Sequence, residues 1–466
     1  MGISSLGVGS SILTQDVLDQ LRAADEATMI TPINTKLKAE QDKQDELDVL
    51  DASMNNLIDA IDEIKSATLY DSRTTNVTGS SVSVSAQSNS DVQSFSLDVV
   101  KLATRQIEQS GSFAAKDTAI ATGVGSLNLN IDGQNFTIDY DDTTTLDDLK
   151  KTINDVAGDK VQATVVQIAG GDYRLFLSSV DTGSTQNITM TDNAGAGSAL
   201  DPAALSALTT SFDAAAVQTG IDAEFKYNNQ TITRSSNTVS DLVSGLTITL
   251  KEVGASTVSV EQDREAIKEK MNSFVEKYNS TMNELIKTTK ASTDAAERGV
   301  FSSDSSIKSM KSALSDMLSL VGGGVGSLMD YGFDVDKEGK LSFDSSVLDT
   351  KLDENPKNVE AFFSGGTYTK ADSSTVELTG AFAELSTIVG GYTDRNATLD
   401  QLKESYAETI STINDRLTSM TDRLNAKYEI LSKQFQAYDA IISKINSASS
   451  MFVQMANAYT AAQNNG

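Results

Sequence analysis

Hydrophobic side chains change their spacing twice along the chain, which divides it into three stretches. From Ile30 to Ile64 they recur at alternating intervals of three and four residues, and this predicts a long helix packed against another helix. The positions are Leu47, Leu50, Met54, Leu57, Ile61 and Ile64. From near Tyr70 to about Val260, hydrophobic and polar residues alternate, which predicts half-buried β-strands. The helical spacing returns at Arg264, so we expect helices at both ends of the chain and strands between them.

The best-defined part of the strand region is a predicted ββαββ unit. Two alternating runs flank Asp132-Gly133, a dipeptide typical of two-residue hairpin turns. Thr145 precedes a helical run, and Asp148 stands three residues after Thr145, as in a capping box. Gly158 is expected to end that helix. Two further strands, joined by a Gly-Gly pair, are predicted after the helix at residues 161–168 and 173–178.

A second β-rich region surrounds this unit in the sequence. Alternating residues precede the unit at 82–99 and follow it at 223–250. Between them, residues 192–220 are rich in Ala, Thr, Ser and Gly, and we expect a loose connection there.

Turn and cap residues organise the C-terminal helical region. Asp304 precedes a helical run, and Glu338-Gly339 lies between hydrophobic residues that predict a hairpin. Asn355-Pro356 predicts the start of a short helix that ends at Gly365, with Asn as the cap and Pro in the first turn. The longest helix is predicted from Leu399 to about Phe452, with a coiled-coil spacing interrupted by a single extra four-residue step.

The order of these elements predicts an α+β multidomain fold. A long antiparallel helical or coiled-coil leg is built from both termini, and two β-rich head modules are inserted between them. We divide the chain into terminal helical segments, a helical leg domain, a β-rich head module and a β-rich insertion module. The terminal helical segments are residues 1–40 with 430–466, and the helical leg domain is 41–70 with 262–429. The β-rich head module is 71–110 with 215–261, and the β-rich insertion module is 111–214.

The common spacing of the two helical stretches predicts a seam inside the leg. Because an insertion topology brings the chain ends together, we expect the residues from Leu417 to Leu431 to face the helix around residues 47–64. The alternative is a seam that faces a neighbouring subunit. The predicted seam residues are Leu50, Leu57, Ile61, Leu417, Met420, Leu424 and Leu431.

Composition excludes several kinds of chemistry. The 466 residues include no His and no Cys, which excludes serine triads, thiol nucleophiles, zinc sites built from His or Cys, and disulfides. Met1 to Gln15 lack the positive charge of a secretory signal, and no uncharged apolar run approaches the ~20 residues that span a bilayer. We therefore expect neither a cleaved signal peptide nor a membrane span. The absence of Cys fits the cytoplasm, and equally the export of an unfolded chain.

The charge argues against nucleic acid and anionic lipid as partners. The formal net charge is −28, whereas binding to phosphate backbones depends on Lys and Arg. Residues 71–260 carry 11 basic and 22 acidic residues, whereas the two signs balance between Arg395 and Asn446. The β region and the helical leg are therefore expected to face different surroundings.

Three candidate chemical motifs fail on their spacing or surroundings. Ser327-Leu328 follow the last glycine of the run at 321–326, where a phosphate loop requires Lys and then Ser or Thr. Asp334 begins a run that resembles a calcium loop, but Ser345 stands where a bidentate Glu is required. Paired carboxylates for glycoside hydrolysis are the enzymatic alternative for an acidic cluster that we interpret as a solvated surface: Asp139, Asp141, Asp142, Asp147 and Asp148. We predict no catalytic residue, no metal site and no cofactor, and hence no enzyme.

Both ends of the chain carry hydrophobic residues without nearby charge. No charged residue occurs from Met1 to Gln15 or from Ile445 to Gly466. We interpret these segments as self-assembly surfaces that need a partner, and terminal fraying is the alternative. The candidate contact residues are Leu6, Ile12, Leu13, Leu18, Leu21, Met451, Phe452, Met455 and Tyr459.

Four parts of the chain carry a resemblance to one family. They are Ile3 to Ser10 with Thr31-Pro32-Ile33; residues 127–190; Arg234-Ser-Ser-Asn-Thr-Val-Ser-Asp241 with Gly245-Leu-Thr-Ile-Thr-Leu250; and Tyr331-Gly-Phe333, Gly339-Lys-Leu341 and 356–363. The first resembles the opening of the bacterial flagellar filament cap family, hook-associated protein 2, and the second resembles the flagellin and hook insertion motif. The third looks like the most specific signature of the cap family. The fourth resembles its C-terminal part, where many relatives have Ile in place of Phe333.

This resemblance implies a structural protein of the flagellum. It implies a ring of about four to six copies at the filament tip that promotes flagellin folding and insertion and prevents monomer leakage. The implied partners are further copies of the chain, flagellin, a hook-filament junction protein and an export chaperone. The implied location is extracellular, at the flagellum tip, after export by the flagellar secretion apparatus. Two alternatives are a surface adhesin that binds host glycan or mucin through the head modules, and another flagellar axial protein.

Overall fold

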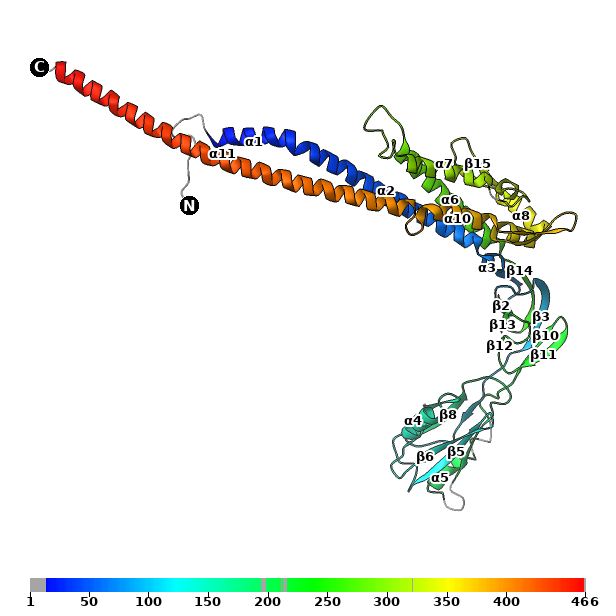
Figure 1. The fold of residues 1–466 in the computed structure, drawn as a ribbon. Coiled ribbons are helices and arrows are strands. Elements are labelled where there is room, and N and C mark those ends of the chain that lie inside the picture. The colour runs from blue at the N-terminus through cyan, green and yellow to red at the C-terminus, as the bar shows by residue number, and fades with distance from the viewer. Residues whose placement is uncertain (1–13, 194–197, 211, 213–215, 321, 465–466) are drawn as a thin grey trace. The chain divides into compact units, whose positions relative to one another are not determined.

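The computed structural model describes residues 14–193, 198–210, 212, 216–320 and 322–464. The chain divides into two compact units (Figure 1). The helical unit comprises residues 1–67 with 267–466, and the β unit comprises residues 68–266. The predicted α+β fold with helical terminal regions is confirmed.

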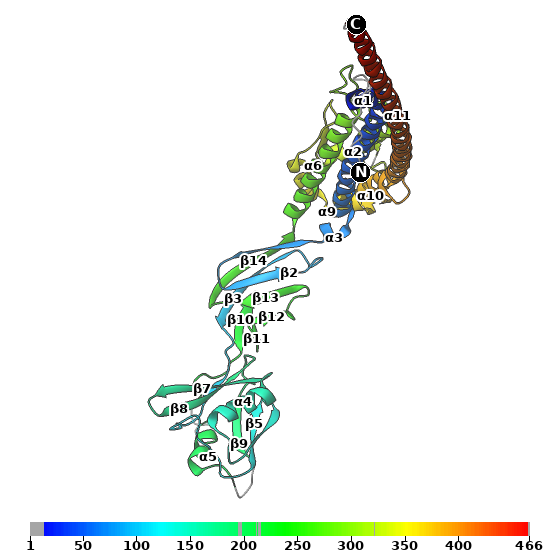
Figure 2. The ribbon, with the colours of Figure 1, turned by 90° about the vertical axis from the view of Figure 1, so that its left-hand side faces the viewer.

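Three long helices define the helical unit. Helix α1 (Gln15–Met29) is followed directly by α2 (Thr31–Lys65), and Pro32 occupies the first turn of α2. Helix α11 (Thr398–Asn464) runs antiparallel to both, because Lys403 pairs with Asp51 on α2 and Lys427 pairs with Asp25 on α1. Figures 1 and 2 show α11 alongside α2 and α1 and continuing past the start of α1. The predicted helix at 30–64 is confirmed, whereas α11 extends beyond its predicted end.

Further elements complete this unit, and several of them lie against α2. They are α6 (Arg264–Thr289), α7 (Ser305–Leu320), η1 (Leu328–Tyr331), α8 (Ser345–Glu354), α9 (Pro356–Ser364), α10 (Ala381–Thr393) and the hairpins β15 (Phe333–Val335) with β16 (Leu341–Phe343) and β17 (Gly366–Thr369) with β18 (Thr375–Leu378). The short helix α3 (Ala67–Tyr70) follows α2 in the chain, and all but its first residue belong to the β unit. The core is aromatic: Phe274 and Phe382 meet edge to face with ring centroids 4.9 Å apart. The predicted caps at Asp304 and Asn355 are confirmed, because each side chain accepts hydrogen bonds from backbone N–H groups of the helix that follows.

The first module of the β unit is built from two antiparallel sheets. One has the order β1-β14-β3-β10-β11 and the other β12-β13-β2. The strands are β1 (Arg73–Thr78), β2 (Val82–Ala86), β3 (Gln93–Lys101), β10 (Ala223–Tyr227), β11 (Gln230–Arg234), β12 (Thr238–Val239), β13 (Leu246–Leu250) and β14 (Gly254–Gln262). Their inward residues, including Phe95, Leu97, Phe225 and Val258, form one hydrophobic core.

The second module contains the predicted ββαββ unit. Its sheets have the orders β6-β5-β9 and β4-β8-β7, and α4 (Leu146–Ala157) packs between them on a separate core. The strands are β4 (Ile107–Gln109), β5 (Gly125–Ile131), β6 (Gln134–Tyr140), β7 (Val161–Ala169), β8 (Asp172–Ser179) and β9 (Ile188–Asp192). Asp132 and Gly133 have φ of 48° and 73°, as the predicted hairpin turn requires. The capping box of Thr145 and Asp148 is confirmed.

The predicted loose connection at 192–220 is wrong in one part. Helix α5 (Pro202–Leu208) forms there, and Leu208 and Phe212 are fully buried in the core of the second module. The helix is short and begins at a Pro in its first turn, so it offers too few residues for helical periodicity to be visible.

Among the described residues, no helix is both long and apolar enough to cross a membrane.

Candidate assembly surface

Helices α1 and α11 meet through a small hydrophobic cluster. Leu424 and Tyr428 of α11 are buried against Leu18 of α1. Partly buried residues extend the cluster at Met29, Ile30, Leu431 and Phe435. Leu424 and Leu431 therefore lie against α1 and the start of α2, and the expectation that they face residues 47–64 is wrong.

The antiparallel register explains this correction. Lys403 forms ion pairs with Asp48 at 3.0 Å and Asp51 at 2.7 Å, so the start of α11 already occupies the position beside the middle of α2. Residues further along α11 consequently meet α1. Leu417 and Met420, between these two regions, are half-buried.

The middle and end of α2 are buried by other elements. The predicted seam residues Leu50, Leu57 and Ile61 are completely inaccessible to solvent. Besides α11, this part of α2 lies against α10 and α6, and Ser53 shares a hydrogen bond of 2.9 Å with Thr281 of α6. A 3-4 spacing predicted the buried face of α2 but not which helices cover it.

Polar contacts flank the cluster between α1 and α11. Asp25 accepts hydrogen bonds of 2.7 Å from both Lys427 and the Tyr428 hydroxyl. The bond from Lys427, and next that from Tyr428, lowers the pKa of Asp25. Burial, and next the hydrogen bond to Asp25, raises the pKa of Tyr428 to about 12.

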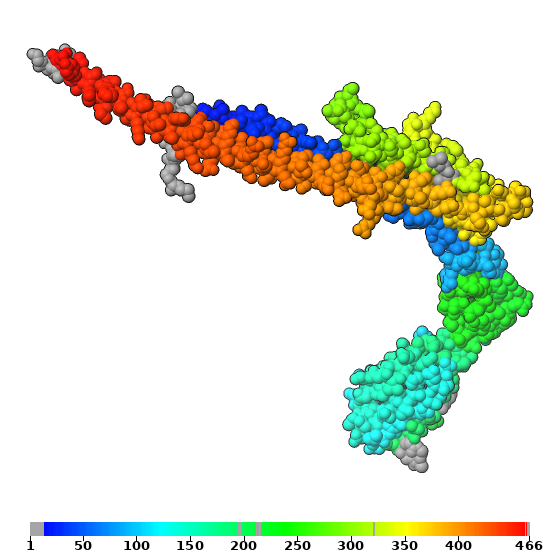
Figure 3. Space-filling model, viewed as in Figure 1, coloured from blue at the N-terminus to red at the C-terminus, as the bar shows by residue number. Residues whose placement is uncertain are grey.

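Beyond this contact, α11 exposes a hydrophobic stripe, which we call the terminal seam. Its members follow the alternating three and four residue spacing without a break, with Ala448 at the intermediate position. They are Tyr438, Ile441, Ile445, Phe452, Met455 and Tyr459. Phe452 and Tyr459 are each 67% exposed. Figure 3 shows this end of α11 in red, projecting beyond the N-terminal helices of the same unit.

From Ile445 onward, the terminal seam lies on a helix segment without charge. Lys444 is the last charged residue, and the segment after it exposes two further hydrophobic side chains, Met451 and Val453, among Ser, Ala, Asn, Gln and Thr. Exposed apolar side chains on an uncharged helix fit a protein partner rather than water, since solvated helix surfaces usually carry charged residues.

The predicted contact residues fall into three groups. Met451, Phe452, Met455 and Tyr459 are exposed on α11, and Leu21 is partly exposed on α1. Leu18 is instead buried against α11. Leu6, Ile12 and Leu13 lie outside the described residues. The sequence interpretation missed Tyr438, Ile441 and Ile445 as exposed positions, although their continued 3-4 spacing could have identified them.

The acidic cluster of the second module stabilises local structure. Asp141 accepts hydrogen bonds from Thr143 and Thr144, which lower its pKa. Asp147 pairs with Lys116 and Lys150 at 2.8 and 3.0 Å. Within the described part of the chain, no group of acidic residues has the arrangement of a metal site.

The sequence that resembles a calcium loop forms a turn. One carboxylate oxygen of Asp336 accepts hydrogen bonds from the backbone N–H groups of Glu338 and Lys340 at 3.0 and 2.8 Å. The predicted hairpin at Glu338-Gly339 is thereby confirmed.

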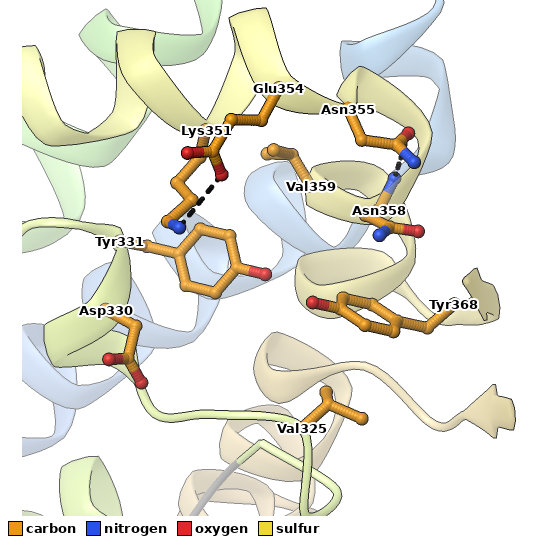
Figure 4. A pocket seen from close by; sticks show the side chains of 9 residues that line it. All are labelled: Val325, Asp330, Tyr331, Lys351, Glu354, Asn355, Asn358, Val359 and Tyr368. Carbon is orange, nitrogen blue, oxygen red and sulfur yellow. Dashed lines mark hydrogen bonds and ion pairs between the residues drawn. The ribbon is translucent and has the colours of Figure 1, made fainter. Parts of the chain in front are cut away.

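A polar cavity of about 280 Å³ opens beside η1, α8 and α9 (Figure 4). Its lining groups engage one another: Lys351 pairs with Glu354 at 3.0 Å, and Asn355 accepts from the backbone N–H of Asn358. Burial raises the pKa of Tyr331, whose ring stacks on Phe362. These contacts hold the corner between α8 and α9.

Residues 234–241, which carry the most specific resemblance, tie the β unit together. Arg234 Nε contacts both carboxylate oxygens of Asp241 at 3.0 Å. The Asn237 side chain accepts from the Ala103 N–H at 2.8 Å and donates to the Ala103 carbonyl at 2.9 Å. The Thr182 hydroxyl donates to the carbonyl of Ser235 at 2.6 Å. The motif therefore links the segments that follow β3 and β8 to the stretch of chain between β11 and β13.

Comparison with known proteins finds matches along most of the chain. The family model described as flagellar hook-associated protein 2 N-terminus matches residues 10–106, and the corresponding C-terminus model matches residues 220–447. Flagellar hook-associated protein 2 of Campylobacter jejuni is 28% identical over 94% of this chain and 79% of its own length. The protein of that name from Aeromonas caviae is 26% identical over 98% of this chain and 99% of its own length.

A solved structure shares the fold. The crystal structure of the D1-D2-D3 domains of the flagellar cap protein FliD from Escherichia coli aligns with a TM-score of 0.61 at 22% identity. It covers 78% of this chain and 99% of that structure. The comparisons support the filament-cap interpretation of the sequence and not the adhesin alternative.

Proposed function

This chain belongs to the flagellar hook-associated protein 2 family, and from that premise we propose that it is a structural protein that caps the tip of the bacterial flagellar filament. Its family is structural.

The terminal seam is the observation that supports a capping contact. A cap must hold the end of a growing filament and yet release it, which requires a surface that remains available after the chain has folded. The seam from Tyr438 to Tyr459 is such a surface, because its side chains are exposed on a helix that the rest of the described chain does not cover.

We assign finer roles by extension of this proposal. The chain forms a ring of about four to six copies, the β units make its plate, and the terminal seam contacts flagellin. The ring promotes flagellin folding and insertion and prevents leakage of monomers. A hook-filament junction protein and an export chaperone complete the set of proposed partners.

The test is complementation of a strain that lacks its own cap protein. The double variant Phe452→Glu and Met455→Glu places two charges on the terminal seam. We expect it to abolish swimming and to release unpolymerised flagellin into the medium, because burying unpaired carboxylates in an apolar contact is unfavourable.

A matched control adds the same two charges elsewhere on α11. Asn414→Glu and Thr418→Glu lie at exposed positions in the charged part of the helix. This variant is expected to swim normally. Normal filament growth with the Phe452 and Met455 variant, at equal protein levels, would contradict the proposal.

A further inference from the structure

Strand β7 leaves one of its two edges unpaired. It is the outer strand of the sheet β4-β8-β7, and among the described strands it pairs only with β8. Beyond Ala163, its side chains are exposed apart from Val165, which is half-buried against the module core. Figure 2 shows the hairpin of β7 and β8 at the margin of its module.

The side chain of Asn154 reveals which backbone groups point to this edge. Its amide donates to the Ala163 carbonyl at 3.0 Å and accepts from the Ala163 N–H at 2.7 Å. The N–H and C=O of one residue leave a strand on the same side, and the side alternates along the strand. Val165 and Gln167 therefore direct their backbone groups to the same edge as Ala163.

The open part of the edge is short and well delimited. Asn154 covers it at Ala163, and a register shift between Gln167 and Ala169 ends the regular strand. Among the described residues, no hydrogen bond engages the outward groups of Val165 and Gln167. Two residues thus offer a complete set of unpaired donors and acceptors.

This edge also lacks the usual protection against strand pairing. Natural edge strands commonly carry Lys, Pro or inward-pointing charges, whereas all residues of β7 are uncharged. On the neighbouring strand β8, Asp172 and Arg174 neutralise each other in an ion pair of 3.1 Å. In a chain of net charge −28, β7 is an edge at which two copies can meet without like-charge repulsion.

We propose that two copies of this chain pair antiparallel through their β7 edges, around a two-fold axis at Val166. The outward backbone N–H and C=O of Val165 in each copy then form hydrogen bonds with those of Gln167 in the other copy. The two Val166 side chains face each other across the axis. An axis at Val165 would require the groups of Ala163, which Asn154 already occupies. An axis at Gln167 would cross the register shift.

The resulting contact is a continuous sheet across two copies. Its strand order is β4-β8-β7 followed by the same three strands of the second copy in reverse. The area is below the ~1,000 Å² expected of a stable interface, so two isolated chains should pair weakly. A two-fold contact cannot join neighbours within one cyclic ring, so it would link copies of two facing rings, where several such contacts would strengthen one another by avidity.

The absence of Cys makes a cysteine scan the decisive test. In the proposed register, the two copies of residue 166 form a non-hydrogen-bonded pair whose Cα separation of ~4.5 Å suits a disulfide. Val166→Cys is therefore expected to form a covalent dimer on mild oxidation at high protein concentration. Gln162→Cys is the matched control, because it is exposed on the same face of β7 but would lie opposite residue 170 of the second copy.

A second variant separates edge pairing from random collision. Gln167→Pro removes an outward N–H and leaves the β7–β8 ladder intact, so thermal unfolding should be unchanged. Added to Val166→Cys, it should reduce the rate of cross-linking to that of Gln162→Cys.

Two results would overturn the proposal. One is equal cross-linking of Val166→Cys and Gln162→Cys. The other is a disulfide that forms only with a cysteine variant of flagellin, which would assign this edge to a different partner. Neither result would affect the capping test, since β7 lies outside the terminal seam.

Discussion

Short polar side chains fix the backbone at several points where the chain changes direction. Thr145, Asp304 and Asn355 begin helices by accepting backbone hydrogen bonds from residues at most three positions away. Such local contacts can be predicted from sequence, and these three were. The Asn237 side chain likewise accepts a hydrogen bond from the backbone N–H of Ala103. Because 134 residues separate the two, this contact cannot be predicted from a local sequence pattern.

Replacing Asn237 should destabilise the β unit. Asn237→Ala leaves the N–H and carbonyl of Ala103 without their partner, which costs about 1–3 kcal/mol when such groups are buried. Chemical denaturation followed by circular dichroism measures this loss. Thr238→Ala, at the exposed neighbouring position, is the control and should change stability by less than about 0.5 kcal/mol. Equal stabilities of the two variants would contradict the assigned role.

The pair of Asp25 with Lys427 and Tyr428 should make the α1–α11 contact dependent on pH. Since folding lowers the pKa of Asp25 from 3.8, its carboxylate stabilises the contact above pH 3.8, and this contribution is lost as pH falls through the lowered pKa. Hydrogen exchange of α1 should therefore be slower in the wild type than in Asp25→Asn at neutral pH. The difference should disappear in strong acid. A difference that persists there would indicate a role other than charge.

At the scale of elements, hydrophobic spacing predicted faces but not partners. The 3-4 positions of α2 are buried as predicted, but those of α11 change from buried at Leu424 to exposed at Ile445, and Leu424 and Leu431 meet α1 rather than the end of α2. Spacing specifies which side of a helix is apolar, whereas the register between two helices depends on contacts such as Lys403 with Asp51, which are 352 residues apart. Helix α5 escaped prediction because it is too short to display a period.

The seam between α1 and α11 should be sensitive to truncation of one side chain. Leu424 is 2% exposed, and Leu424→Ala is expected to cost about 2–5 kcal/mol in the stability of this contact. Ile430→Ala, at a position 58% exposed on the same helix, should have little effect. Thermal unfolding and sedimentation should be measured together. An unchanged melting temperature with smaller oligomers would show that Leu424 faces another subunit.

At the scale of the whole molecule, the two units should be separable. The β unit contains both of its cores within residues 68–266, so that fragment should fold alone and show cooperative unfolding with a strand signal. Residues 14–67 provide the contrast, because the residues that bury α2 belong to 267–464. This second fragment should not form a stable monomer. A β fragment that unfolds without cooperativity would contradict the division.

Removing the terminal seam beyond Tyr438 should separate folding from function. A chain that ends at Asp439 loses side chains that are mostly exposed, so both units should keep their thermal stability. The same chain should fail to cap filaments in the complementation assay. A marked loss of helical stability would instead show that this end of α11 supports its own unit.

The pairing of α11 with α1 and α2 also constrains the order of folding. Lys427 and Asp25 are 402 residues apart, so the helical unit cannot close until almost the whole chain is available. The β unit needs only the middle of the chain and can form first, when the chain emerges from its N-terminus. During that delay the apolar face of α2 has no native partner, and the chain is most exposed to misassembly. Folding rate should then be limited by this late, long-range closure rather than by the strands.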